Sequence, residues 1–202
     1  MAVDNYITLK EPSQGAIFKD KSSKFLGYAY PINSEEEVKP LIEQLKKEHH
    51  AARHWCYAWQ LGVENIRYRA NDDGEPSNSA GKPIYGQIIS HKLTNILVVV
   101  VRYYGGINLG VGGLIQAYKT AAHYSLETAK KVEKIIKTHY KLEFEYTVLN
   151  KVMRIVKEQQ LLIVNQTMEL SCKMEIAVRQ SDAQKIATIF NDFYGVKLTD
   201  VN

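Results

Sequence analysis

The stretch NILVVVVRYYGGINLGVGGL, residues 95–114, decides the fold of the first part of the chain. Its apolar run from Ile96 to Val101 is far shorter than the roughly 20 residues that a membrane-spanning helix needs. A run that is apolar on both faces predicts a buried central strand over residues 95–104. Five glycines follow within nine residues. A helix is predicted next, because apolar residues recur at helical spacing at Leu114, Ala117, Tyr118 and Ala121.

The glycine-rich connection is a candidate site for an anion or another ligand. Glycine permits positive φ angles and close approach of another group, and a helix amino terminus exposes unpaired N–H groups with a partial positive charge. The connection lacks the Lys-Ser/Thr of a phosphate-binding loop and the GxGxxG spacing of a dinucleotide-binding turn. The alternative is a tight crossover that needs glycine only for packing. The candidate ligand-binding residues are Arg102, Gly105, Gly106, Gly110, Gly112 and Gly113, together with Lys82 and His54.

A second candidate is the acidic loop, in which Asp72, Asp73 and Glu75 lie within four positions. Carboxylates are ligands for Mg²⁺ or Ca²⁺, but the alternating ligands and the closing glutamate of an EF-hand are missing. The alternative is a polar surface loop over residues 71–83, built on an Asp-Gly turn. Lys82 would then pair with a carboxylate or meet a phosphate. Mg²⁺ is the one cofactor that this loop suggests.

Three histidines and a cysteine stand close together in the segment HHAARHWC, residues 49–56. None of the ligand spacings of zinc sites is present, so no metal centre is predicted here. His54, just before a predicted strand at residues 55–61, is expected as a polar contact near the glycine-rich connection. Cys56 and Cys172 form no CxxC pattern, and no secretory signal opens the chain. These features favour two buried thiols and a cytoplasmic location.

The last third of the chain predicts a ferredoxin-like domain. Strand-like alternation at residues 141–146 and 170–178 is interleaved with helical spacing at residues 148–156 and 183–190. Further strands are predicted at residues 161–168 and 196–201, which completes the order β-α-β-β-α-β. The predicted fold class is therefore α+β with two domains, residues 1–135 and residues 136–202.

The net charge of +4 lies in the first part of the chain. Residues 1–138 hold 18 basic and 14 acidic residues, whereas the remainder holds 8 of each. An excess of this size permits an anionic partner without requiring one.

Three segments together resemble the signature of the IMPACT/YigZ family. They read ARHWCYAW at residues 52–59, DDGEPS with AGKP at residues 72–83, and VRYYGG with LG and GGL at residues 101–114. The resemblance covers roughly residues 15–125. It implies a first domain with the α+β fold shared by a small-subunit ribosomal protein, elongation factor G and the GHMP kinases. It also implies a second domain similar to the last domain of elongation factor G.

The resemblance implies a translation-linked regulatory or binding module that contacts RNA, the ribosome or a translation-associated protein. Eukaryotic relatives bind a co-activator of a stress-response kinase, and the family has no settled catalytic residues. Neither membrane nor DNA is an expected partner. The alternative is a metal-assisted enzyme for a phosphorylated or nucleotide substrate, which requires the acidic loop to meet the glycine-rich connection. We expect binding rather than catalysis, because the phosphate-loop lysine is missing.

Overall fold

The computed structural model describes residues 4–201, which form two compact units. One unit comprises residues 6–134, and the other comprises residues 135–201 together with residues 4–5. Each unit mixes helices with sheet and has its own hydrophobic core. The predicted α+β class with two domains is therefore confirmed.

The first unit is built on an antiparallel sheet with the order β2-β4-β7-β5-β6, in which β3 also pairs with β4. Strand β7 is central, because it pairs with β4 on one side and β5 on the other. Its residues from Ile96 to Val101 are completely buried, as the apolar run predicts. The strands are β2 (Ser13–Gln14), β3 (Phe18–Asp20), β4 (Ser23–Pro31), β5 (His54–Leu61), β6 (Arg67–Asn71) and β7 (Ile96–Tyr103).

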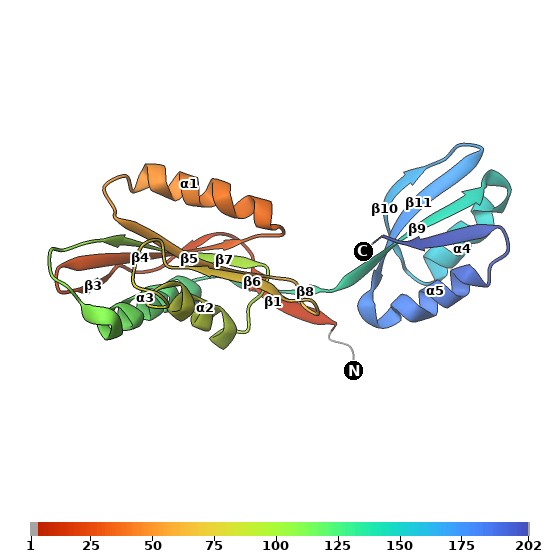
Figure 1. Cartoon of the computed structure of the whole chain (residues 1–202). Coiled ribbons are helices and arrows are strands. Elements are labelled where there is room, and N and C mark those ends of the chain that lie inside the picture. The colour runs from red at the N-terminus through yellow and green to blue at the C-terminus, as the bar shows by residue number, and fades with distance from the viewer. Residues whose placement is uncertain (1–3, 202) are drawn as a thin grey trace. The chain divides into compact units, whose positions relative to one another are not determined.

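Helices cover both faces of this sheet (Figure 1). Helix α1 (Val38–Glu48) lies on one face, while α2 (Gly81–Ser90) and α3 (Gly110–Glu127) lie on the other. The alternation of β7 separates two cores, because Val99 packs on the α1 side and Val100 on the side of α2 and α3. A separate two-stranded sheet joins β1 (Asn5–Leu9) to β8 (Lys131–Ile135).

The structure departs from the sequence predictions at α2 and β6. Residues 71–83 were expected to be loop throughout, but α2 begins at Gly81, and Pro83 is tolerated because it lies in the first turn. Strand β6 was not predicted, because four of its five residues are exposed and two of them are arginines. Helix α1 begins at Val38, after a short 3₁₀ turn (Glu35–Glu37). Like Pro83 in α2, Pro40 therefore lies in the first turn of its helix, where it interrupts no hydrogen bond of the helix.

The second unit has the predicted ferredoxin-like order, with its sheet arranged as β10-β11-β9-β12. Both helices contribute to the single core of the sheet. Its elements are β9 (Lys137–Glu145), α4 (Leu149–Glu158), β10 (Leu162–Thr167), β11 (Ser171–Arg179), α5 (Ala183–Asn191) and β12 (Val196–Asp200). None of the helices described in residues 4–201 is long and apolar enough to span a bilayer.

We predict that Gly27→Ala destabilises the protein, because β4 passes directly beneath α3 at this position. An added Cβ would overlap the carbonyl oxygen of Ala121, and overpacking of this kind costs about 1–3 kcal/mol. The free energy of unfolding in urea measures the effect. Gly86→Ala in α2 is the matched control, since its Cβ would meet open space and the helix would gain up to about 1 kcal/mol. Equal effects of the two substitutions would contradict the close approach.

Candidate functional site

The acidic loop turns its first carboxylate inward, onto the start of α2. The backbone N–H groups of Ala80 and Gly81 donate to Asp72 Oδ1 at 3.0 and 2.8 Å, and that of Asn78 donates to Oδ2 at 2.9 Å. A carboxylate in this position satisfies the unpaired N–H groups of a helix amino terminus. Asp72 therefore serves to organise the loop and helix α2.

Asp73 holds the same loop against the start of β5. The backbone N–H of Trp55 donates to Asp73 Oδ2 at 2.7 Å, and the side chain of His54 donates through Nδ1 to the Asp73 carbonyl at 2.7 Å. The structure thus brings His54 and the acidic loop together. His50 does not join them, because α1 ends at Glu48 and His50 is exposed.

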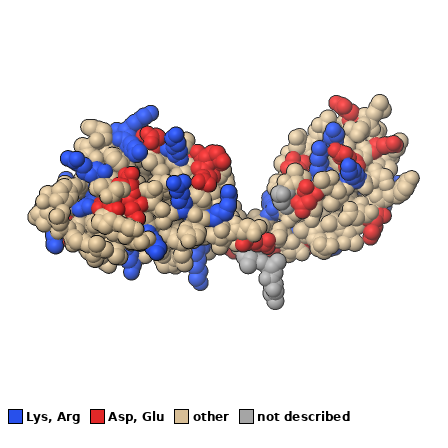
Figure 2. Space-filling view, viewed as in Figure 1, with Lys and Arg blue, Asp and Glu red and all other residues tan. Residues whose placement is uncertain are grey.

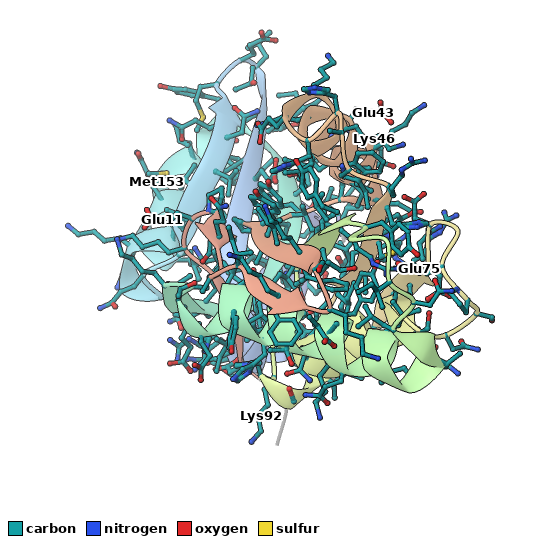
Figure 3. All side chains as sticks on the ribbon, turned by 90° about the vertical axis from the view of Figure 1, so that its left-hand side faces the viewer. Glu11, Glu43, Lys46, Glu75, Lys92 and Met153 are labelled. Atoms are coloured by element: carbon teal, nitrogen blue, oxygen red, sulfur yellow. The ribbon has the colours of Figure 1, made fainter. Side chains whose placement is uncertain are left out.

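Glu75 and Arg102 form a buried ion pair at the end of β7. Arg102 Nη1 donates to Glu75 Oε1 at 2.6 Å, and the two side chains are only 5% and 4% exposed. The Tyr118 hydroxyl from α3 donates to the same oxygen at 2.7 Å. Figure 3 labels Glu75 beside the loop that leads from β6 to α2. The pair ties this loop to the central strand and to α3.

The guanidinium of Arg102 is also enclosed by aromatic rings. Its Cζ atom lies 5.4 Å from the ring centre of Phe25 and 5.3 Å from that of Tyr104, which are distances typical of cation–π contacts. Within residues 4–201, Arg102 Nε has no hydrogen-bond acceptor. Arg102 is therefore held inside the unit and does not offer its charge to a ligand at the surface.

The groups next to this ion pair are poor nucleophiles. Burial raises the pKa of the Cys56 thiol, and the carboxylates of Glu75 and Asp73 raise it further. Burial also raises the pKa of the Tyr118 hydroxyl. Since the thiolate is the reactive form of cysteine, Cys56 is a structural thiol here, and it donates to the Asp72 carbonyl at 2.9 Å.

The acidic loop does not present a set of ligands that fits Mg²⁺. Its three carboxylates accept hydrogen bonds from separate partners rather than facing one point, whereas Mg²⁺ requires oxygen ligands in near-octahedral geometry. Among the described residues, no group of three His, Cys, Asp or Glu is placed to hold a metal ion. Lys82 is exposed in the first turn of α2, and the ion pairs of residues 4–201 do not include it.

The glycines of the connection between β7 and α3 fall into two groups. Gly105 is required for packing, because a Cβ would overlap Ser22, and Gly113 lies close to Leu109. Around Gly106, Gly110 and Gly112 the corresponding space is open, and the first two have positive φ angles of 84° and 72°. The packing alternative therefore explains only some of these glycines.

Helix α3 begins without a cap. Its N-cap residue Leu109 has no side-chain acceptor for the helix, and the first turn contains no acidic residue. Helix α2, by contrast, has its first N–H groups occupied by Asp72. Of the two helix starts, only that of α3 leaves its first N–H groups and their partial positive charge available to an anion.

The lysines of the β3–β4 hairpin, which lies beside Gly105, were not among the predicted site residues. The Gly105 N–H donates to Ser23 Oγ at 3.2 Å. Lys19 and Lys24 are directly opposite each other in this hairpin, and Lys21 lies in its turn. All three are exposed, and none belongs to an ion pair of the described residues. The run KDKSSK at residues 19–24, with three lysines in six positions, is the sequence signal that could have indicated them.

We predict that Glu75→Gln lowers the free energy of unfolding by about 3–5 kcal/mol, because it leaves the buried Arg102 charge without its partner. Urea unfolding of the single and double variants measures this. Adding Arg102→Met to Glu75→Gln should recover part of the loss, since the second change removes the uncompensated charge. Losses that simply add in the double variant would show that the two residues are energetically independent.

Comparisons with known proteins agree with this architecture. The model of the Impact N-terminal domain family matches residues 21–126. IMPACT family member YvyE of Bacillus subtilis (strain 168) is 35% identical over 79% of this chain and 73% of its own length. IMPACT family member YigZ of Escherichia coli (strain K12) is 31% identical over 86% of each chain.

A solved structure has the same fold over nearly its whole length. It is a crystal structure described as that of a hypothetical protein, with a TM-score of 0.73 and 27% identity, over 99% of this chain and 98% of that chain. The match to the family model, the two relatives and the segments around His54, Glu75 and Arg102 lead to one conclusion. The chain belongs to the IMPACT family.

Proposed function

We propose that this chain is a translation-linked regulatory or binding module that engages an anionic partner, either RNA and the ribosome or a translation-associated protein. The contact is made by the hairpin end of the first unit, defined as Lys19, Lys21 and Lys24 with residues 104–113. The link with translation rests on what the family resemblance implies. A cytoplasmic location, where thiols such as Cys56 and Cys172 stay reduced, is part of the same proposal.

The observation that carries the proposal is the unneutralised pair of Lys19 and Lys24. Like charges directly opposite each other on neighbouring strands are destabilising. No carboxylate of the described residues forms an ion pair with either of them. An anionic partner would remove this repulsion on binding.

The uncapped start of α3 supports the same contact. Ser23 binds the Gly105 N–H and so holds the hairpin beside the connection to α3. Gly106, Gly110 and Gly112 leave the backbone of this connection open to approach. Cationic side chains and unpaired amides together are what phosphate or carboxylate groups require.

The acidic loop supports binding rather than catalysis. Each of Asp72, Asp73 and Glu75 is occupied by contacts that maintain the fold. The enzyme alternative needed these carboxylates to hold a metal beside the glycine-rich connection. The loop does reach α3 through Tyr118, but it does so with a carboxylate that is already paired to Arg102.

We predict that the full chain cosediments with ribosomes at low salt and that Lys19→Glu/Lys24→Glu weakens this binding. The control is Lys151→Glu/Lys185→Glu, which makes the same change of net charge on the second unit at two exposed positions. Affinity should fall linearly on a logarithmic scale as salt rises, because neutralised phosphates or carboxylates release counterions. The slope should be smaller for the Lys19/Lys24 variant.

Two results would contradict the proposal. The first is the absence of ribosome binding even at low ionic strength, where electrostatic contacts are strongest. The second is an equal loss in both double variants, because a response to overall charge alone would not require the hairpin end.

A further inference from the structure

An exposed apolar surface overlaps the hairpin end and extends along helix α3. Tyr104, Ile107, Val111 and Ile115 are 45%, 51%, 53% and 39% exposed. We call these four residues the apolar tip. Single exposed apolar residues are ordinary, but four large ones within twelve positions form a concentration that has no role in either core.

Two of these side chains share one side of α3, and the other two lie in the loop that leads into it. Val111 and Ile115 are one turn apart on α3, so they lie on the same side of the helix. The Tyr104 hydroxyl donates to Asn108 Oδ1 at 3.2 Å, which fixes the ring over the loop that carries Ile107. The tip is therefore formed by the loop and the first turns of α3, which are one continuous segment of the chain.

The tip is flanked by backbone without side chains. Gly106, Gly110 and Gly112 have open space where a Cβ would lie, so packing within this chain does not account for them. Glycine within a helix lowers its stability relative to alanine. Bare backbone beside apolar side chains allows a second chain to approach closely.

Three lysines flank the tip. Lys21 and Lys24 lie on the hairpin that contacts Gly105, and Lys119 is one turn beyond Ile115 on α3. These three lysines are exposed and belong to no ion pair within residues 4–201. In Figure 2 the left-hand end of the first unit is largely uncharged, with Lys and Arg side chains at its margin. Among the acidic residues, Glu75 is buried and paired with Arg102, and Asp20 on the hairpin is half-buried.

We propose that the apolar tip is a docking site for an acidic amphipathic segment of a partner protein. Its apolar face would cover Ile107, Val111 and Ile115, and its carboxylates would meet Lys21, Lys24 and Lys119. This inference rests on the proposed function, because it selects a protein rather than RNA as the anionic partner. The mode of binding is that of an amphipathic helix laid on an apolar surface with complementary charges.

The aliphatic side chains favour a protein partner over RNA. Single-stranded RNA is bound mainly through cations and through bases that stack on aromatic rings. Tyr104 is the only aromatic ring of the tip, and the other three members are branched aliphatic residues. Phosphate contacts would use the lysines but would leave Ile107, Val111 and Ile115 uncovered.

Nuclear magnetic resonance of the labelled full chain tests the inference. The probe is a synthetic 16-residue helical peptide, a length of about four turns, with leucines on one face and glutamates elsewhere. We expect its addition at millimolar concentration, where even weak complexes are populated, to shift the amide resonances of residues 104–119. A peptide of the same composition with the pattern scrambled should produce a much smaller effect.

Substitutions locate the contact. Ile107→Ser/Val111→Ser should weaken binding of the amphipathic peptide by about tenfold or more, as expected when central apolar contacts are truncated. Ile89→Ser is the control, because Ile89 is equally exposed, at 54%, on α2. All three positions are at the surface, so the variants should fold, which their unshifted resonances elsewhere would verify.

Four outcomes would overturn the inference. Two concern the peptides, namely no shift with the amphipathic peptide or equal shifts with the scrambled one. The third is a shift of the same amide resonances when single-stranded RNA is added in place of the peptide. The fourth is a set of shifts that depend on protein concentration without any peptide, which would identify a second copy of the chain as the occupant. Ribosome binding without a peptide response would overturn the docking site but leave the proposed function standing. A peptide response without ribosome binding would support the docking site but contradict the ribosome contact of the proposed function.

Discussion

The buried ion pair of Glu75 and Arg102 is the constraint on which the rest of the first unit depends. It joins three parts that are distant in the sequence, namely the loop after β6, the end of central strand β7 and, through Tyr118, helix α3. A buried ion pair of this kind need not add to the net stability of the fold, because burying two charges is costly. Loss of one partner is nevertheless strongly destabilising, since it leaves an uncompensated charge in the interior. The pair therefore fixes where the loop lies and which of its groups face inward.

The inward direction of the acidic loop determines what remains at the surface. Asp72 is used at the start of α2 and Asp73 at the start of β5. The start of α3, by contrast, has no cap, and the neighbouring hairpin carries Lys19 and Lys24 without acidic partners. An arrangement with hydrogen-bonded carboxylates facing inward and unpaired lysines at the surface suits binding of an anion, and the apolar tip adds a means to prefer a protein.

The sequence was sufficient for the parts whose pattern is local. The apolar run of β7, the helical spacing of α3 and the alternation in β11 each predicted their element, and the order of the second unit followed. Helix α2 was missed because Gly81, Pro83 and Gly86 obscure its pattern, and β6 because its exposed residues do not alternate. The sequence identified the residues of the candidate site by their chemical type, but it could not predict which of them contact one another. Whether Glu75 faces a metal or Arg102 depends on a contact across 27 positions.

We propose that the first unit acts through the hairpin end and the apolar tip, while the acidic loop maintains the fold. Hydrogen exchange of the backbone amides, with and without ribosomes, tests this most directly, because exchange reports local opening and protection. We predict increased protection in residues 19–24 and 104–115, with the exchange of residues 72–81 unchanged. Protection confined to residues 72–81, or to the second unit, would contradict it.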